Sequence, residues 1–315
     1  MNKVNKYMVA ALTSVSLFFT PVSLAGEKVD ATLPSAGVNT VTVENLSGDV
    51  TIIGWDDAVV KVKGELDDNA EKIIFEQTGK TITIKVDMPN RGSWNSKGSK
   101  LIIHMPTDLR LNFESVSSDV ELENLTNNVA VKTVSGDIKA TKLNNRIELI
   151  SVSGNISTKS LQGDINLSSV SGDIKDKDSK GVIYFQAVSG EINVSSQAHE
   201  VSINNISGNS ELNLAEVDEF KASTVSGDTE VRLSLKPNAA VKASTVSGSL
   251  EFDFQNKVSA DFRLKANAGG DLINKLTNQK ADRAKYGPSS KLFFQTGDAN
   301  GSVRVNTVSG EVTVK

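Results

Sequence analysis

Apolar and polar residues alternate over short stretches along most of the chain, and small polar residues separate these stretches. A period of two in segments rich in valine and isoleucine is typical of β-strands, whereas a helix repeats its apolar positions every three to four residues. The paired apolar positions of the central part are Ile138 and Ala140, Ile147 and Leu149, Ile165 and Leu167, Ile192 and Val194, and Val201 and Ile203. The pattern predicts an all-β protein with these side chains in its core.

A tetrapeptide, Val-Ser-Gly-Asp with close variants, recurs between the strands. Its third position recurs at a constant interval from Ser118 to Gly208 and then at slightly longer intervals. The glycines of this column are Gly136, Gly154, Gly172, Gly190, Gly208, Gly227 and Gly248, with outlying copies at Gly48 and Gly310. A weaker column lies half-way between, at Asn127, Asn145, Gly163 and Gly181. Glycine and asparagine tolerate a positive φ, so both columns predict tight turns, and Gly172→Val is expected to strain its turn.

A strand, a turn, a second strand and a second turn, repeated about every 18 residues, predict a parallel β-solenoid. Each coil buries its inward side chains on its two neighbours, because one coil cannot bury them alone. A flattened coil with two faces is favoured over a three-sided one, because the turn residues recur twice in each repeat and not three times. The usual hand of parallel crossovers favours a right-handed coil.

The two ends of the chain are less regular than its middle. We expect one continuous domain in which residues 26–114 form an N-terminal β region that starts or caps the solenoid, residues 115–250 form the regular repeats, and residues 251–315 form a C-terminal β region and cap. Caps are expected because an uncovered terminal coil exposes unpaired strand edges. Residues 89–100 are predicted to be a polar loop, and residues 271–286 a short helix.

The start of the chain, residues 1–25, has the pattern of a secretory signal peptide. Lys3 and Lys6 precede an apolar stretch at residues 7–19, and Ser23-Leu24-Ala25 supplies a small-x-small cleavage site. No later stretch approaches the ~20 apolar residues of a transmembrane helix. The sequence therefore predicts an exported protein of the periplasm or cell surface.

Composition narrows the classes of function. The net charge of -4 argues against nucleic-acid binding, which needs a concentrated positive surface. The chain has no cysteine, so disulfides, thiolate metal sites and cysteine nucleophiles are excluded. Aromatic residues make up only 5% of the chain, which predicts a thin core.

Stacked coils would align the repeat into columns of like side chains. A serine column comprises Ser117, Ser135, Ser153, Ser171, Ser189, Ser207, Ser226 and Ser247. Two residues on, the column reads Asp119, Asp137, Asn155, Asp173, Glu191, Asn209, Asp228 and Ser249. The favoured interpretation is structural, with Ser and Asp side chains capping backbone N–H groups of the turns. The alternative is a calcium ladder formed by Asp119, Asp137, Asp173, Glu191 and Asp228.

A column of small residues precedes each valine of the repeat and is expected to face inward at a crowded corner. It comprises Ser115, Thr133, Ser151, Ser169, Ala187, Asn205, Thr224 and Thr245. The two histidines, His104 and His199, lack the neighbours of a catalytic triad and are too few for a three-histidine metal site. Trp55 is expected to pack in the cap, and Trp94 lies in the polar loop.

The repeat and its opening segment resemble a known family. The segment reads Val-Glu-Asn-Leu-Ser-Gly-Asp-Val at residues 43–50 and Gly-Trp-Asp-Asp at 54–57, followed by Val-Lys-Val at 60–62. Together with the repeated Val-Ser-Gly-Asp-Ile, it is similar to the putative-adhesin family of bacterial β-strand-repeat proteins, a domain of unknown function. The resemblance implies a β-helix-like fold at the bacterial envelope and supplies no catalytic residues.

The leading hypothesis is a non-catalytic, adhesin-like binding or scaffold protein without a cofactor. Its partner would be an envelope polymer, a glycan or another protein. A polysaccharide-active enzyme is the first alternative, but coils of constant length leave little material for the walls of a catalytic cleft. The second alternative is a sensor or regulatory domain that responds to envelope stress.

Overall fold

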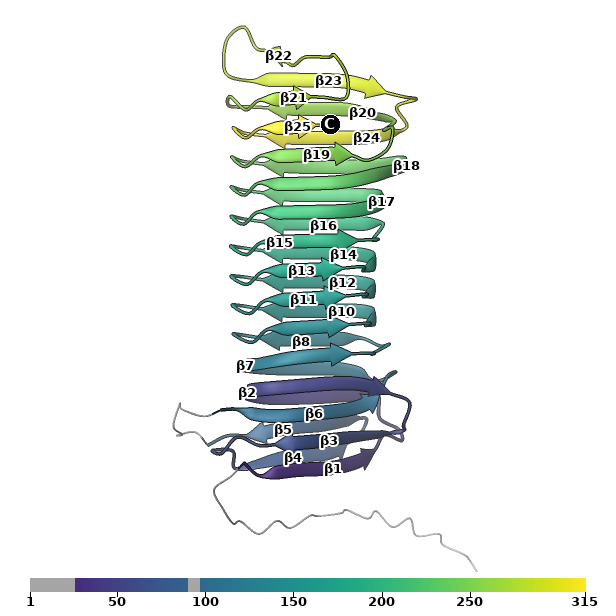
Figure 1. Cartoon of the computed structure of the whole chain (residues 1–315), viewed down its shortest axis with the longest axis vertical. Helices are drawn as coiled ribbons and strands as arrows, with labels where there is room; N and C mark the ends of the chain where they lie inside the picture. Colours follow the sequence, from purple (N-terminus) through teal and green to yellow (C-terminus); the bar gives the residue numbers. More distant parts are fainter. Residues whose placement is uncertain (1–25, 90–96) are drawn as a thin grey trace, which may run out of the picture.

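The computed structural model describes residues 26–89 and 97–315, and every regular element within them is a β-strand. The predicted signal peptide, Trp94 and most of the predicted polar loop lie outside the described residues. The strands stack into a tall rod in which they run across the long axis (Figure 1). No helix of the described residues is long and apolar enough to cross a membrane.

In the middle of the rod, each coil contributes one strand to each of two opposite faces. The first face contains β8 (Val129–Thr133), β10 (Asn144–Ser151), β12 (Gln162–Ser169), β14 (Lys180–Ala187) and β16 (Glu200–Asn205). The second face contains β9 (Ile138–Thr141), β11 (Ile156–Lys159), β13 (Ile174–Lys177), β15 (Ile192–Ser196) and β19 (Leu250–Phe254). The long strands β17 (Ser210–Thr224) and β18 (Thr229–Thr245) run from the second face into the first.

Neighbouring coils pair as parallel strands in constant register. Ile147 aligns with Ile165, which aligns with Ile183, and backbone hydrogen bonds continue between coils in the turns. All the inward positions predicted from the alternation are at most 5% exposed. The core also takes in Phe185, Phe220, Phe252 and Phe262 towards the C-terminal end, where each ring is fully buried. Burial of such side chains supplies ~1.5–3 kcal/mol each, so stacking the coils stabilises the fold.

The repeat glycines occupy their positions for a different reason from the one predicted. Gly172 does not have a positive φ, so that prediction is wrong for the regular column. A Cβ added to Gly172 would lie only 2.0 Å from the carbonyl oxygen of Gly154 in the coil below, and Gly136, Gly154, Gly190, Gly208, Gly227 and Gly248 make the same close approach. Glycine is therefore required because successive turns pack backbone on backbone.

Positive φ angles occur instead at the opposite edge of the rod. Asn145, Gly163 and Gly181 have φ of 86°, 125° and 109°, as the half-way column predicted, whereas Asn127 has no positive φ. A second column that the sequence did not reveal contains Asn124, Lys142, Ser160 and Asp178, with φ between 53° and 59°. Each of these four residues directly follows the end of a strand (β7, β9, β11 or β13), where a positive φ lets the chain reverse within a short distance.

The column of small residues faces inward, as expected. Thr133, Ser151, Ser169, Ala187, Asn205, Thr224 and Thr245 are all buried, and Ser115 is partly buried. The Ser151 Oγ accepts a hydrogen bond of 2.8 Å from the N–H of Gly154, and the Ser169 Oγ accepts one of 2.9 Å from Gly172. The hydroxyls therefore cap the N–H groups of the tight turn from within.

At the N-terminal end, the order of the strands in space differs from their order in sequence. The strands are β1 (Lys28–Pro34), β2 (Thr40–Trp55), β3 (Val59–Glu65), β4 (Lys72–Thr78), β5 (Thr81–Asp87), β6 (Ser99–Pro106) and β7 (Arg110–Glu123). The long strand β2 lies between β7 on one side and β5 and β6 on the other. The antiparallel pairs β4–β5, β3–β6 and β1–β3 cover the end of the stack.

The C-terminal end has a comparable insertion. Its strands are β20 (Ala260–Ala266), β21 (Leu272–Asn274), β22 (Asp282–Arg283), β23 (Ser290–Thr296), β24 (Gly301–Thr307) and β25 (Val312–Val314). β24 lies between β18 and β20, and β25 lies between β19 and β21. The last coil in sequence thus fills a gap between two earlier segments.

The helix predicted at residues 271–286 is absent from the described structure. This segment contains the short strands β21 and β22 joined by turns. Leu272 pairs in register with Val312, and the Asn274 Oδ1 accepts hydrogen bonds from the N–H groups of Leu276 and Thr277. Strand pairing and this asparagine-capped turn satisfy the backbone groups that a helix would have used.

Candidate binding surface on the first face

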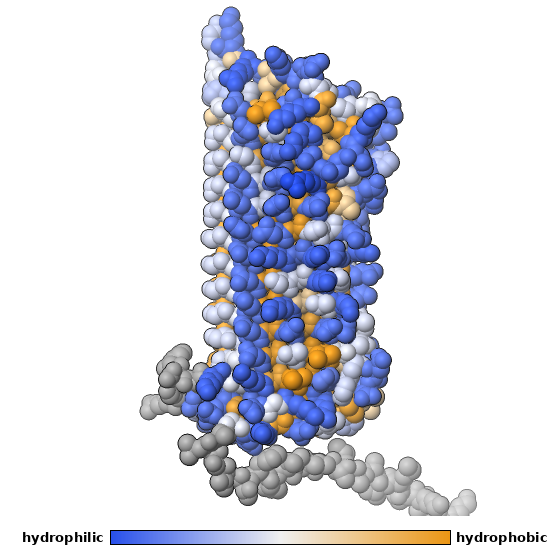
Figure 2. Space-filling view, in the orientation of Figure 1, coloured by the Kyte–Doolittle hydropathy of each residue, from blue (hydrophilic) through white to orange (hydrophobic). Residues whose placement is uncertain are grey.

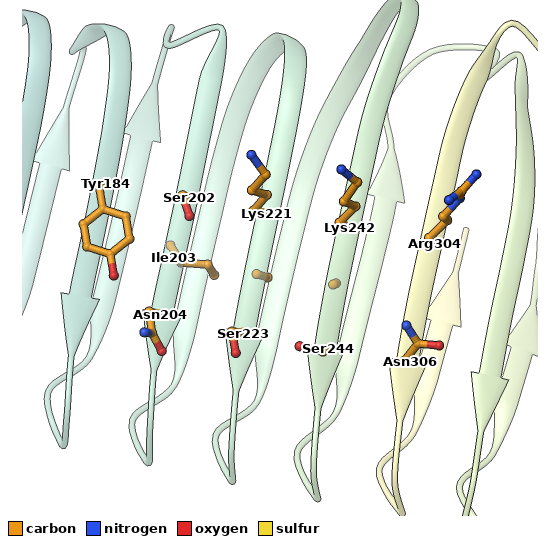
Figure 3. Close-up of a pocket in the computed structure, with 12 residues that line it drawn as sticks. Tyr184, Ser202, Ile203, Asn204, Lys221, Ser223, Lys242, Ser244, Arg304 and Asn306 are labelled. Carbon is orange, nitrogen blue, oxygen red and sulfur yellow. The ribbon is translucent and has the colours of Figure 1, made fainter.

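Outward side chains on the C-terminal half of the first face form columns that cross the strands. One column contains Tyr184 on β14, Ser202 on β16, Lys221 on β17, Lys242 on β18 and Arg304 on β24, aligned by strand register. A second column, two residues further along each strand, contains Gln186, Asn204, Ser223, Ser244 and Asn306. Figure 3 shows side chains of both columns projecting from successive strands.

The members of the two columns other than Gln186 line a shallow, open concavity of about 500 Å³. Its floor is the sheet itself, and hydroxyl, amide, ammonium and guanidinium groups surround it. Lys221, Ser223, Ser244 and Arg304 are exposed to solvent, and the Lys242 side chain is 58% exposed. The surface therefore offers many hydrogen-bond donors to a ligand that lies across the strands.

Positive charge accumulates here although the chain as a whole has a net charge of -4. The Lys221 Nζ lies 2.8 Å from a Glu219 carboxylate oxygen, and the hydrogen bond from Lys221 lowers the pKa of Glu219 below its ordinary value. The Lys242 Nζ makes only a 3.9 Å contact with the same carboxylate. Arg304 makes no ion pair with any described residue.

The cationic column continues beyond the concavity. Arg263 on β20 aligns with Arg304 and forms a 2.8 Å ion pair with Asp261. Phe293 on the antiparallel strand β23 aligns with Arg263 and is 48% exposed. The sequence did not reveal this surface, because Arg304 and Arg263 join the column of Lys221 and Lys242 only through the insertion of β24 between β18 and β20.

Side chains of the acidic column of the repeat accept hydrogen bonds from backbone N–H groups of the next coil. The Asp119 Oδ1 accepts a 2.8 Å bond from the N–H of Asp137, and the Asp137 Oδ1 accepts a 2.7 Å bond from the N–H of Asn155. The same bond links Asn155 to Asp173, Asp173 to Glu191, Asn209 to Asp228, and Asp228 to Ser249. Among the described residues, no group of three or more His, Asp or Glu side chains is placed to hold a metal ion.

The valines of the repeat form a stripe on one narrow edge of the rod. The left side of Figure 2 shows mainly a pale column of residues of intermediate hydropathy, with little orange between them. The members of the stripe are each 40–45% exposed and comprise Leu46, Val116, Val134, Val152, Val170, Ile206, Val225, Val246 and Val308. Each side chain covers part of the next one along the stack, which limits the apolar area that water meets. The serine column beside it, from Ser117 to Ser247, is largely exposed.

The remaining residues that the sequence singled out lie apart from one another. His104 is on β6 in the N-terminal cap, where its ring centroid is 4.9 Å from that of Trp55. The Trp55 Nε1 donates to the carbonyl of Val59, so this indole packs in the cap as expected. His199 lies in the turn before β16.

Two buried acids were not anticipated, Asp67 in the N-terminal end and Asp176 in the regular coils. Asp176 occupies an inward position of β13 and is 4% exposed, with its Oδ1 accepting hydrogen bonds from Thr158 Oγ1 at 2.6 Å and Ser179 Oγ at 2.5 Å. Its Oδ2 has no hydrogen-bond partner in the described structure. Burial raises the pKa of Asp176, and the two hydroxyls offset the rise only in part.

Comparison with solved structures shows the same fold in other bacterial proteins. A putative adhesin from Parabacteroides distasonis is 15% identical, with a TM-score of 0.51, 72% of this chain covered and 97% of the other. A putative adhesin from Parabacteroides merdae is 13% identical, with a TM-score of 0.52, 72% of this chain covered and 96% of the other. A search of curated proteins finds no match.

The sequence itself matches a family profile over most of its length. The profile described as Toastrack DUF4097 matches residues 38–146, 111–198 and 145–315 in overlapping segments. These segments together run from β2 to β25, so that β1 is the one described strand outside the match. This chain therefore belongs to the Toastrack DUF4097 family.

Proposed function

We propose that this protein is exported and acts as a non-catalytic, adhesin-like binding module at the bacterial cell envelope. The observation that carries the proposal is the open face of the rod, on which hydroxyl, amide and cationic side chains are held in register by parallel strands. A rigid sheet that presents polar groups without enclosing walls suits the binding of an extended partner. A catalytic site would instead need a walled cleft with positioned acid and base groups.

The two solved relatives support this role only in outline. Their descriptions call them putative adhesins, and their likeness to this chain concerns the fold. The signal-peptide pattern of residues 1–25 supports export, and cleavage after Ala25 is part of the proposal. We also propose a right-handed coil and one continuous domain, with residues 26–114 and 251–315 as the caps of repeats 115–250.

Binding and turnover distinguish the proposal from its enzymatic alternative. The chain of residues 26–315 is incubated with polysaccharide fractions from a bacterial envelope, and both retention of the protein and release of reducing ends are measured. We expect retention with no release above a protein-free control. Release of reducing ends would overturn the non-catalytic role, and an absence of retention on every fraction would overturn the binding role.

Export is tested separately in cells. The full chain is expressed in a Gram-negative host, the cells are fractionated, and the N-terminus of the recovered protein is sequenced. We expect protein in the periplasmic or surface fraction with Gly26 as its first residue. Recovery in the cytoplasm with residues 1–25 still attached contradicts the export proposal.

A further inference from the structure

The surface around the concavity has an order that points to one class of ligand. Across neighbouring strands the aligned outward side chains are Tyr184, Ser202, Lys221, Lys242, Arg304, Arg263 and Phe293. Four cations thus lie between two aromatic side chains. With strands ~4.8 Å apart, this row spans roughly 29 Å along the rod.

The centre of the row lacks close neutralising partners. Lys242 and Arg304 are in register on adjacent strands, and of the two only Lys242 approaches an acid among the described residues, at 3.9 Å. Two like charges on adjacent strands repel each other weakly in water. An anionic group placed between them removes this repulsion and makes charge-assisted hydrogen bonds to both.

The flanking residues indicate a sparsely charged ligand. Lys221 and Arg263, on either side of the central pair, are each in a 2.8 Å ion pair with Glu219 and Asp261. These two carboxylates would repel a polymer that carries a charge on every unit. A polymer with neutral units between its charges can place an anion at Lys242 and Arg304. Its uncharged units then lie over the flanking strands, where Lys221 and Arg263 are already paired with acids.

The second column supplies the groups that recognise those neutral units. Asn204, Ser223, Ser244 and Asn306 are exposed and can both donate and accept hydrogen bonds, as sugar hydroxyls require. A sugar ring advances an extended polysaccharide by about one strand spacing, so successive rings can follow successive strands. Tyr184 and Phe293 offer aromatic surfaces at the two ends of the row, where the apolar face of a sugar ring can pack.

We propose that this row, which we call the cationic row, binds an acidic polysaccharide with uronic-acid units spaced by neutral sugars, lying along the rod axis. The inference rests on the proposed binding function and adds the chemical class of the ligand. Lys242 and Arg304 hold a uronate carboxylate, and the asparagines and serines beside them bind the adjoining sugar hydroxyls. Because the attraction is electrostatic at an exposed surface, affinity falls as ionic strength rises.

The test measures binding of the chain of residues 26–315 to soluble polymers by isothermal titration calorimetry. The probes are hyaluronan, in which uronate alternates with a neutral sugar, dextran, which is uncharged, and poly-glutamate, which is a polyanion without sugars. We expect hyaluronan to bind at low salt at least tenfold more tightly than either of the others. Equal binding of dextran overturns the role of charge, and equal binding of poly-glutamate overturns the role of the sugar.

Matched variants locate the site. Lys242→Gln with Arg304→Gln removes the central charges, and we expect a tenfold or greater loss of hyaluronan affinity with an unchanged Tm. The control is Lys159→Gln with Lys177→Gln, a pair of exposed lysines equally adjacent in register but on the second face, away from the concavity. The control is expected to bind as the unaltered chain does.

Equal losses in the two double variants would show a non-specific charge effect and overturn the cationic row as the site. Failure of hyaluronan to bind the unaltered chain overturns the ligand class. The proposed function is judged independently, by retention on envelope fractions without turnover. Retention that persists in the Lys242→Gln and Arg304→Gln variant would leave the binding function standing and sink this inference.

Discussion

At the scale of single residues, the repeat glycines show how close the turns lie to one another. The Cβ of an alanine at position 172 would be placed 2.0 Å from the Gly154 carbonyl oxygen, and Gly172 itself has no positive φ. The restriction is therefore steric and comes from the neighbouring coil. Any side chain has to push two coils apart.

The first prediction separates this steric restriction from backbone strain. Gly172→Ala and Gly172→Asn are both expected to lower the free energy of unfolding by about 1–3 kcal/mol or more, because either Cβ overpacks the turn. Denaturant unfolding measures the change, with the exposed Lys175→Ala as a control that costs little. A positive-φ requirement would let asparagine rescue much of the loss, so a near-normal Gly172→Asn variant contradicts the steric explanation.

Asp176 gives a second prediction at this scale, on pH dependence. Because burial raises the pKa of Asp176 in the folded state, the folded protein favours the protonated acid and loses stability as the pH rises above the ordinary carboxyl value of 3.8. Asp176→Asn resembles the protonated form at every pH. We expect the variant to match the unaltered chain near pH 4 and to have the higher Tm at pH 7. A lower Tm at pH 7 would show that the ionised carboxylate stabilises the fold.

At the scale of the element, the acidic column holds successive turns together. The Asp137 Oδ1 accepts from the N–H of Asn155 in the next coil, and Asn155 does the same for Asp173. Aspartate and asparagine alternate freely along the column because either side chain offers this oxygen. Where the column has Asp or Asn, the shared feature is this hydrogen bond and not the charge.

The third prediction follows from that equivalence. Asp137→Asn is expected to leave the free energy of unfolding nearly unchanged, whereas Asp137→Ala loses one hydrogen bond and costs about 0.5–1.5 kcal/mol. Chemical denaturation of both variants measures the difference. Added calcium is expected to produce neither heat nor a shift in Tm, and a calcium-dependent rise in Tm that Asp137→Asn abolishes would establish the ladder of acids as a metal site instead.

The elements also show how far the sequence predicts the structure. Alternation identified the buried positions of the regular coils, and the constant interval between turns indicated parallel stacking, because both signals are local and repeat many times. The helix expected at residues 271–286 was wrong, because Leu272 pairs with Val312, a residue far away in the sequence. The cationic row was missed for the same kind of reason, since Lys242 and Arg304 become neighbours only when β24 is inserted next to β18.

At the scale of the whole molecule, the two ends are built by strands that return to the stack. β2 lies between strands that follow it in sequence, and β24 and β25 lie between segments that precede them. Val303, Val305, Val312 and Val314 are fully buried in this last coil. The C-terminal cap therefore depends on contacts that are distant in sequence.

The fourth prediction concerns this coil. Removal of residues 301–315 leaves β18 and β20 without the strand that pairs with both. We expect the free energy of unfolding to fall by well above the ~2–5 kcal/mol that replacing one large core side chain with alanine costs. Thermal unfolding and size-exclusion chromatography measure stability and aggregation, which unpaired edges promote. A synthetic peptide of residues 301–315 is expected to restore the Tm. A truncated chain that stays monomeric with an unchanged Tm would contradict a structural role for the insertion.

The insertion of β24 and β25 also determines the order in which the C-terminal strands can join the stack. A ribosome releases residues 260–274 before residues 301–315, so β20 and β21 are synthesised while the place beside β18 and β19 is still vacant. Addition of each new coil to the last is therefore expected to build the rod only from β7 to β19. In the expected final step, residues 301–315 enter between β18 and β19 on one side and β20 and β21 on the other. Until they do, the same position can be filled by residues 301–315 of another copy of the chain, which would produce a domain-swapped dimer.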